Sequence, residues 1–217
     1  TFDFISTNLS NSRLKGKNMK PSKTTNQKAM NRLNDEAIKQ LFTEARTYSN
    51  WQDKGVAAET LRELYNLAIM GPTSMNTLPA RFVFLTTPSA KQKLLPALAE
   101  GNHAKTLAAP VTVIVAHDPK FYTHLPELFP HASNADQMFA NDGALSEITA
   151  FRNGTLQGAW LIMAARALGL DCGPMSGFDN DKTDEIFFAD NGWQSNFLVN
   201  MGYGVKEKLH NRGKRLS

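Results

Sequence analysis

The 217-residue sequence predicts an α+β domain in which helices cover a mixed or antiparallel sheet. Segments with helical and strand periods occur together, but they do not alternate in regular βαβ order. Residues 111–116 form a short, wholly apolar run, which is typical of a strand buried on both faces. Hydrophobic residues make up 41% and charged residues 20% of the chain, as in ordinary globular domains. We therefore expect one domain over residues 34–217.

Residues 1–33 are rich in Asn, Ser, Thr and Lys and have no period that would bury a face, so we expect a disordered leader there. The first 30 residues hold six Lys or Arg against one Asp, a net charge of +5, whereas the whole chain is +4. The remainder is therefore about −1. The basic pI of 9.2 reflects the leader and does not indicate a nucleic-acid partner.

Two amphipathic helices are predicted next. Asn34 is a plausible N-cap, and the residues that follow it at i, i+3, i+4, i+7 spacing are Ile38, Leu41, Phe42 and Ala45. The same spacing recurs in Leu61, Leu64, Tyr65 and Ala68, and this second helix should stop at Gly71-Pro72. After a loop at Thr73–Pro79, strands are predicted at Ala80–Thr86 and Val111–Ala116, with a short helix from Ser89 to Leu98 between them. Residues 121–145 read as an irregular covering segment.

The central predicted helix, Thr155–Leu168, is apolar nearly all the way round, so it should be buried in a core or against a partner subunit. Asn153 or Gly154 should start it, and Gly169 should end it in the left-handed conformation. The loop Leu170–Phe178 has two glycines and a proline. It is either a structural turn or a place where main-chain N–H groups approach a flat ligand. A helix at 181–188, a strand at 197–203 and a basic end follow.

Several classes of function find no support in the sequence. Cys172 is the one cysteine, so no intrachain disulfide is possible, and a lone cysteine is more often an inert hydrophobic residue than a nucleophile. Nucleotide-binding, HExxH and CxxC motifs are missing, and the five histidines lack metal-ligand spacing, so we expect no metal site. No apolar run reaches the roughly 18 residues of a membrane span. We expect a cytoplasmic protein without membrane or nucleic-acid partners.

Four separated pieces could meet around one ligand: Ala45-Arg46-Thr47, Gly71–Asn76, Pro174–Gly177 and Arg212–Arg215. With Ala108–Val111, Ala167–Leu170 and Gly202–Gly204 in this order, the chain resembles the FMN-dependent nitroreductase superfamily from residue 34 onward. The segments Phe129-Pro130-His131, Ala150–Asn153 and Gly173–Asp179 resemble its malonic semialdehyde reductase branch, which serves bacterial pyrimidine degradation.

The resemblance implies a three-layer fold, an intertwined homodimer, bound FMN, and NADH or NADPH as co-substrate. It implies that a phosphate clamp consists of Arg46, Thr47, Lys214 and Arg215. Arg212 would compensate for Ala45 and Ser49, which stand where other members often have basic residues. In the loop that includes Thr73 and Ser74, the Asn76 amide would face the flavin pyrimidine ring. The main chain of Pro174, Met175, Ser176 and Gly177 would face flavin N5 and O4.

The implied reaction is hydride transfer from nicotinamide to flavin N5 and then to a second substrate, in a ping-pong scheme. The branch implies malonic semialdehyde or a similar small aldehyde acid as that substrate. Arg152, at the expected helix start, is the candidate anchor for its carboxylate, although it could instead pair with Glu147. A general nitroreductase or quinone reductase is the alternative, and a flavin-binding protein without turnover is the alternative of another class. The residues do not determine the nicotinamide or the physiological acceptor.

Overall fold

The structure is a computed structural model that describes residues 31–216. The expected leader therefore lies outside the described residues except for 31–33, which are exposed and without regular structure. The described part has a four-stranded sheet with the strand order β1-β2-β4-β3. All neighbouring strands are antiparallel. The strands are β1 (Ala80–Leu85), β2 (Val111–His117), β3 (Asp171–Met175) and β4 (Gln194–Gly202).

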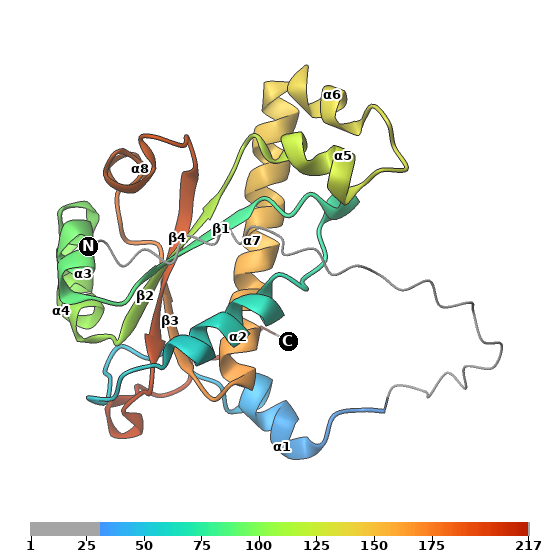
Figure 1. The fold of residues 1–217 in the computed structure, drawn as a ribbon. Coiled ribbons are helices and arrows are strands. Elements are labelled where there is room, and N and C mark those ends of the chain that lie inside the picture. The colour runs from blue at the N-terminus through green and yellow to red at the C-terminus, as the bar shows by residue number, and fades with distance from the viewer. Residues whose placement is uncertain (1–30, 217) are drawn as a thin grey trace.

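Helices cover both faces of this sheet, which confirms the predicted three-layer α+β fold (Figure 1). On one face lie α2 (Ala58–Ala68) and the long α7 (Gly143–Ala167). On the other lie α3 (Pro88–Leu94), α4 (Glu100–Ala108) and α8 (Asn180–Phe188). Alternate residues of the strands enter two separate cores: Phe84 and Val113 belong to the α2/α7 side, and Leu85 and Ile114 to the α3/α8 side. Every residue of β2 is buried, as predicted for a strand covered on both faces.

The central helix α7 begins about ten residues earlier than predicted, so the predicted start at Asn153 or Gly154 is wrong. Asp142 caps the helix, because its side chain accepts a hydrogen bond of 2.9 Å from Leu145 N. Gly154 lies inside the helix, where a Cβ would come within 2.9 Å of His117 Cβ. The missing side chain of Gly154 therefore allows α7 to approach β2 closely. Gly154 neither starts nor ends the helix.

The predicted end of α7 is confirmed. Gly169 has a φ of 75°. Gly169 N donates to Arg166 O at 3.0 Å, and Leu170 N donates to Ala165 O at 2.9 Å. These two bonds form a Schellman motif, which satisfies carbonyls at the helix end. The chain then enters β3, whereas the sequence predicted an irregular loop. Because β3 is an edge strand, Pro174 costs no ladder hydrogen bond on the open side.

Other elements also differ from the predictions. The segment expected to be irregular contains α5 (Leu125–Leu128) and α6 (Ala135–Ala140), which share a small core that includes Phe121 and Phe139. Asn34 caps the first helix as predicted, through a 2.8 Å bond from Ala37 N. That helix, α1 (Asp35–Ile38), is short and continues as a π-helical turn over Lys39–Thr43. Phe42, expected on a buried stripe, is 53% exposed.

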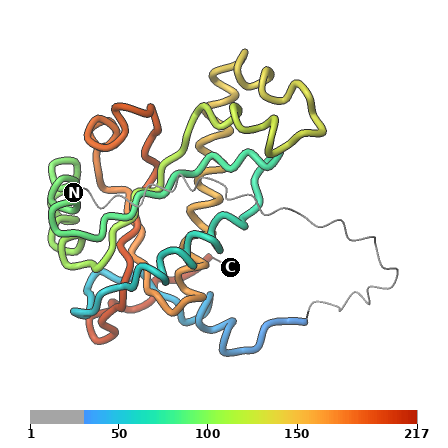
Figure 2. Tube along the Cα trace, viewed as in Figure 1, coloured from blue at the N-terminus to red at the C-terminus, as the bar shows by residue number. Residues whose placement is uncertain are grey.

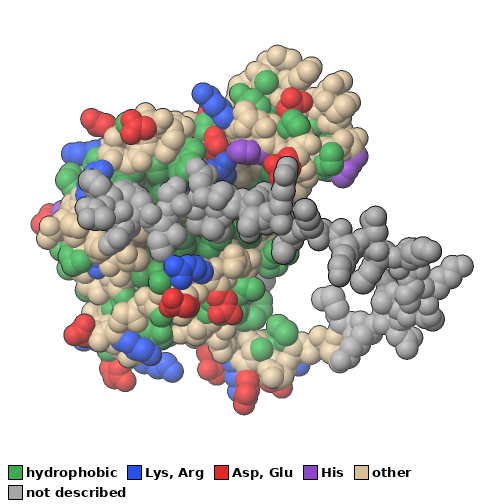
Figure 3. Space-filling view, viewed as in Figure 1, with side chains coloured by type: hydrophobic (Ala, Val, Ile, Leu, Met, Phe, Trp, Pro, Cys, Tyr) green, Lys and Arg blue, Asp and Glu red, His purple; other side chains and the backbone are tan. Residues whose placement is uncertain are grey.

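The outer face of α7 is apolar but uncovered. Four large side chains on it are between 43% and 51% exposed: Ile148, Phe151, Leu156 and Trp160. Charges elsewhere are mixed, since blue and red side chains are interspersed over the face seen in Figure 3. Within the described residues, no helix is both long and apolar enough to cross a membrane.

Candidate functional site

Residues 45–52 pair with the start of β3 on one side and with the C-terminal segment on the other. Tyr48 N donates to Cys172 O at 3.0 Å, and Thr47 bridges to Cys172 at the start of β3. On the other side, Gln52 N donates to Tyr203 O at 2.8 Å and Val205 N to Asn50 O at 3.0 Å. In Figure 2 this cyan segment and the red C-terminal part run side by side. Arg46 and Thr47 are thus placed beside both β3 and the C-terminal segment.

Two glycines make this close approach possible. A Cβ on Gly173 would lie 2.3 Å from Tyr48 O, and one on Gly204 would lie 2.0 Å from the Tyr48 ring. Tyr48 is consequently buried, and burial is the main cause that raises the pKa of its phenol. Any larger residue at 173 or 204 would push residues 45–52 away from the sheet.

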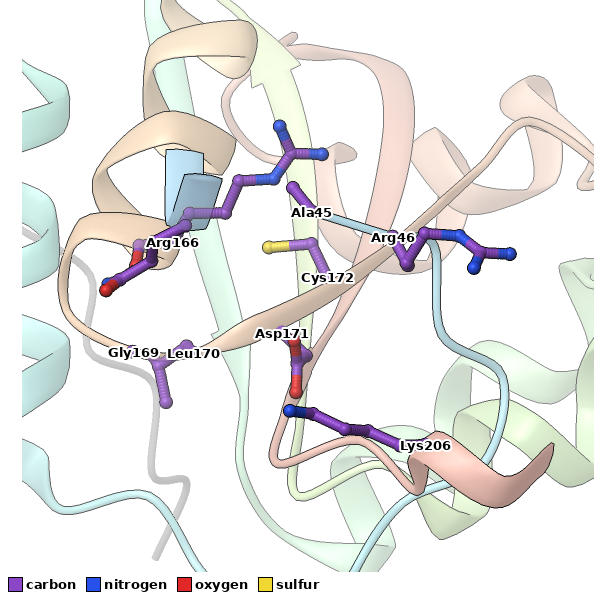
Figure 4. Close-up of a pocket in the computed structure, with 9 residues that line it drawn as sticks. Ala45, Arg46, Arg166, Gly169, Leu170, Asp171, Cys172 and Lys206 are labelled. Atoms are coloured by element: carbon purple, nitrogen blue, oxygen red, sulfur yellow. The ribbon is translucent and has the colours of Figure 1, made fainter. Parts of the chain in front are cut away.

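A small cavity of about 240 Å³ lies on the α7 side of this segment. Figure 4 shows the Cys172 thiol between Arg46 and Arg166, with Asp171 and Lys206 nearby. Burial raises the pKa of Cys172 to about 12, so the thiol stays protonated at neutral pH. This agrees with its interpretation as an inert residue and argues against a thiolate nucleophile.

A larger cavity of about 530 Å³ lies on the other side, between Ser49–Trp51, α4 and the C-terminal segment. Lys105 and Lys208 supply two cations to it. The indole Nε1 of Trp51 is buried and has no hydrogen-bond partner among the described residues, although Trp51 lines the cavity. Lys105 was not predicted as a site residue because α4 itself was not predicted. Trp51 and Lys208 were not predicted either, because their place at this cavity depends on how distant segments pack. The small residues Gly101, Ala104 and Ala108 share one helical face with Lys105, and that spacing could have revealed α4.

The turn after β3 is held by hydrogen bonds to the carbonyl group of Gly177. Gly177 O accepts hydrogen bonds from Ala99 N at 3.0 Å and Asn102 Nδ2 at 2.7 Å. Ser176 and Gly177 are exposed, and in the described part of the chain their N–H groups donate no hydrogen bond. A Cβ on Gly177 would lie 2.6 Å from Asn102 Nδ2. Two main-chain donors are therefore held rigidly and remain free for a ligand. Pro174 and Met175, which were predicted in the same loop, lie on β3.

The C-terminal arginines are not equivalent. Arg212 Nη2 donates to Thr43 O at 2.8 Å and to Ala45 O at 2.9 Å, and the Arg46 guanidinium donates to His210 O. Among residues 31–216, the Arg215 guanidinium bonds to the carbonyls of Gly213 and Lys214, and Lys214 is exposed. The structure therefore brings Arg212 and Arg46 together and leaves Lys214 and Arg215 on the surface.

The loop with Thr73, Ser74 and Asn76 lies elsewhere. Ser74 N donates to Asn153 Oδ1 at 2.8 Å, in the middle of α7, and Asn76 Nδ2 donates to Leu128 O at 3.0 Å. Thr73 Oγ1 accepts from Leu78 N at 3.2 Å. Met75, Asn76 and Leu78 have φ values of 51°, 52° and 42°. Three side-chain-bearing residues in the left-handed region mark a strained segment, and such strain often occurs where a loop holds a ligand.

Within one chain, the loop Thr73–Asn76 does not reach residues 45–52. From Asn153 to the end of α7 at Ala167 the helix rises about 21 Å, at about 1.5 Å per residue. Figure 1 shows the loop before β1 near α5, and residues 45–52 near β3 at the opposite end. Arg152 belongs to the loop's end of the molecule. It is exposed in the third turn of α7, so its expected place at a helix N-terminus is wrong.

The described residues contain no group of three or more His, Cys, Asp or Glu side chains that could hold a metal ion. The larger cavity instead combines two cations, Lys105 and Lys208, with the unpaired indole N–H of Trp51. Such a donor set suits an organic anion with hydrogen-bonding edges.

Comparison with known proteins defines the class. The family model described as the nitroreductase family matches residues 42–203. The chain therefore belongs to the nitroreductase family, a family of oxidoreductases.

A protein of Burkholderia lata is 59% identical over 186 residues, which cover 86% of this chain and 95% of the relative. It is named provisionally as an NADH dehydrogenase/NAD(P)H nitroreductase. A Xanthomonas oryzae protein with the same provisional name is 58% identical and covers 85% of this chain and 94% of the relative. Among solved structures, a nitroreductase of Exiguobacterium sibiricum in complex with FMN has a TM-score of 0.73 at 20% identity, over 83% of this chain and 93% of that one.

Proposed function

We propose that this protein is an FMN-dependent NAD(P)H oxidoreductase that works as a homodimer and reduces malonic semialdehyde or a similar small aldehyde acid. The oxidoreductase class follows from family membership. The flavin and the nicotinamide are supported by the names of its relatives and by the FMN complex of a structural neighbour. The substrate and the dimer are inferences from the residues.

The observation that carries the flavin assignment is the pair of free N–H groups at Ser176 and Gly177, which adjoin α4, the helix that lines the larger cavity with Lys105. Flavin, when bound, supplies the hydride-accepting and hydride-donating centre. Fixed N–H donors stabilise negative charge that develops on a bound ring, and they need no reorganisation to do so. Arg46, which lines the smaller cavity beside the same segment, would bind the phosphate together with Thr47, because charged donors suit a phosphate. The unpaired Nε1 of Trp51 offers one further donor.

The homodimer is supported by two features of the single chain. The loop Thr73–Asn76 lies about 20 Å along α7 from residues 45–52. A second copy related by a two-fold axis could supply that loop to the first copy's cavity. The uncovered apolar face of α7, which includes Ile148 and Leu156, would be buried by such pairing.

Arg152 keeps its role as the proposed carboxylate anchor on a different argument from the helix N-terminus. It lies four residues after Ile148 and four before Leu156, so it is an exposed cation within the apolar face of α7. In a dimer through this face, it would be carried next to the second copy's cavity together with the loop bonded to Asn153. A desolvated cation of this kind can bind a small carboxylate. We propose a cytoplasmic location, since the single cysteine gives no sign of an oxidising compartment.

The first experiment is the absorption spectrum of the purified protein. We expect a bound flavin spectrum that NADH or NADPH bleaches within seconds and that an aldehyde acid restores. Colourless protein that takes up no added FMN would overturn the assignment. Flavin that NADH and NADPH do not bleach would favour a binding protein without turnover.

The second experiment separates the substrate classes. Arg152→Gln should lower kcat/KM for malonic semialdehyde at least about tenfold and should spare a neutral quinone, because the loss is that of a charged hydrogen bond. Arg62→Gln, at an exposed arginine on α2, is the control. Equal losses for both acceptors would indicate a structural role. A wild-type protein that reduces nitrofurans or quinones but no aldehyde acid would replace this proposal with a general nitroreductase.

A further inference from the structure

The C-terminal segment continues antiparallel to residues 43–52 well beyond the sheet. Gly204 pairs with Trp51, and Val205 N bonds to Asn50 O. A short turn follows at Lys206–Lys208. After it, His210 O accepts a hydrogen bond from the Arg46 guanidinium. Arg212 donates hydrogen bonds to the carbonyls of Thr43 and Ala45. The facing residue numbers fall on one side as they rise on the other, so a single antiparallel register persists across the turn.

The kind of link changes along this pairing. Up to Val205 the two segments are joined by main-chain hydrogen bonds. Beyond it, the hydrogen bonds between the two segments, as far as residues 31–216 show, come from two guanidinium groups. The links are reciprocal, because Arg46 donates to a carbonyl of the C-terminal segment and Arg212 donates to carbonyls on the Arg46 side. We call this pair of contacts the arginine latch.

We propose that Arg212 is a positioning residue that acts through Arg46 on binding of the flavin phosphate. This inference rests on the proposed flavin function. Arg212 Nη2 is engaged with two carbonyls, one of which belongs to Ala45, directly before Arg46. Hydrogen bonds from a charged donor are stronger than neutral ones, so the latch holds the backbone that carries Arg46. The same contacts hold the C-terminal segment, which carries Lys208, against the cavity.

A positioning role predicts a specific pattern of binding. Removing Arg212 should weaken FMN binding about three- to tenfold, the size of one lost hydrogen bond. Riboflavin, which lacks the phosphate, should bind as before within about twofold, since its binding does not depend on Arg46. When Arg46 is replaced, a further replacement of Arg212 should no longer change the affinity for the flavin phosphate.

The test is a double-mutant cycle with Arg46→Gln, Arg212→Gln and the combined variant, titrated with FMN and riboflavin by flavin fluorescence. Arg62→Gln, at an exposed arginine of α2 that pairs with Glu59, is the matched control. We expect Arg212→Gln to weaken FMN binding in the wild-type background and to add less than about twofold in the Arg46→Gln background. In flavin-free protein, trypsin cleavage after Lys208 should be faster in Arg212→Gln than in wild type.

Fully additive losses would mean that Arg212 acts on FMN binding without Arg46, either directly or through Lys208, and would overturn the positioning role through Arg46. Equal losses for FMN and riboflavin would reduce Arg212 to general structural support. Unchanged cleavage after Lys208 would show that Arg212 does not hold the segment. If wild-type protein binds neither flavin, the proposed function fails first. In that case unchanged cleavage would reject the latch separately.

Discussion

Asn153 and Ser74 are joined by a 2.8 Å hydrogen bond from the Ser74 N–H to the Asn153 side chain, across 79 positions of sequence. The amide nitrogen of Asn153 also donates to Thr149 O at 2.9 Å, so both the oxygen and the nitrogen of this buried amide are hydrogen-bonded. The strained loop before β1 is therefore fixed to the middle of α7 by one side chain.

Asn153→Ala should lower the free energy of unfolding by about 1–3 kcal/mol, because it leaves a partly buried N–H unpaired. It should also reduce flavin content after gel filtration, since the loop loses its anchor. Urea unfolding and the absorption ratio measure the two effects. Asn66→Ala, at an exposed position of α2, should stay within about 0.5 kcal/mol of wild type. Equal effects of the two substitutions would contradict the anchoring role.

Arg46→Ala should weaken FMN retention by about 1.5–3 kcal/mol, the range for a lost hydrogen bond to a charged group. Arg212→Ala should weaken it less, because Arg212 bonds to main-chain carbonyls of the Arg46 segment. Equilibrium dialysis against FMN gives both values. Two equal and negligible losses would mean that residues 45–47 do not bind the phosphate.

Gly158→Ala should destabilise the protein by about 1–3 kcal/mol through overpacking. The added Cβ would lie 2.5 Å from Phe197 Cζ and 3.0 Å from Val115 Cγ1, where α7 packs on the sheet. Gly143→Ala, at the first residue of the same helix with nothing within 4 Å, is the control and should be neutral or slightly stabilising. Thermal unfolding compares the two. A stable Gly158→Ala protein would show that the helix can shift without cost.

Leu156→Glu should disrupt the proposed homodimer, because it puts a charge on the uncovered apolar face of α7, where Leu156 is 47% exposed. Sedimentation of the wild type should give a dimer at micromolar concentration, and the variant should shift toward monomer and lose flavin. Leu107→Glu, at a leucine of similar exposure on α4, should leave the sedimentation unchanged. A flavin-bound wild-type monomer would reject the interface altogether.

The stability of the protein should fall as the pH rises above about 9, in part because of Cys172. Burial raises the pKa of this thiol from 9.0 to about 12 in the folded state, so between these values only the unfolded state loses the proton. The unfolded state is then favoured, by up to about 1.4 kcal/mol per pH unit for this group. Urea midpoints at pH 8 and pH 10 should differ less in Cys172→Ala than in wild type. An identical pH dependence would mean that the thiol ionises freely in the folded protein.

The sequence predicted those elements whose position depends on a local residue pattern. The spacing of Leu61 and Leu64 located α2, the apolar run at 111–116 located β2, and Gly169 marked the end of α7. The start of α7 was missed because its first turns carry a polar and mixed pattern, in which Asp142 was not distinguished from other polar residues. The role of Gly154 depends on His117, which is distant in sequence. No local pattern encodes such a contact.

The site was predictable only in its parts. Order along the chain indicated Arg46, Ser176 and Gly177, and the structure places Arg46 beside the start of β3 and Ser176 and Gly177 just after its end. It could not show that Ser74 and Asn76 lie at the other end of α7, since that depends on the path of α2 and β1. Lys105 and Trp51 were missed because their relation to the cavity arises from the packing of α4 against a remote segment.

The pairing of residues 45–52 with Cys172 and with Tyr203–Val205 bears on how the protein is made. The early segment emerges from the ribosome long before the partners that lie more than 120 residues later. These pairings can form only when nearly the whole chain has been made, because non-local contacts need the intervening chain to be present and closed into a loop. The proposed flavin site is therefore incomplete during most of synthesis. A ribosome-stalled chain that ends before Tyr203 should take up no flavin, however much of its sheet has already formed.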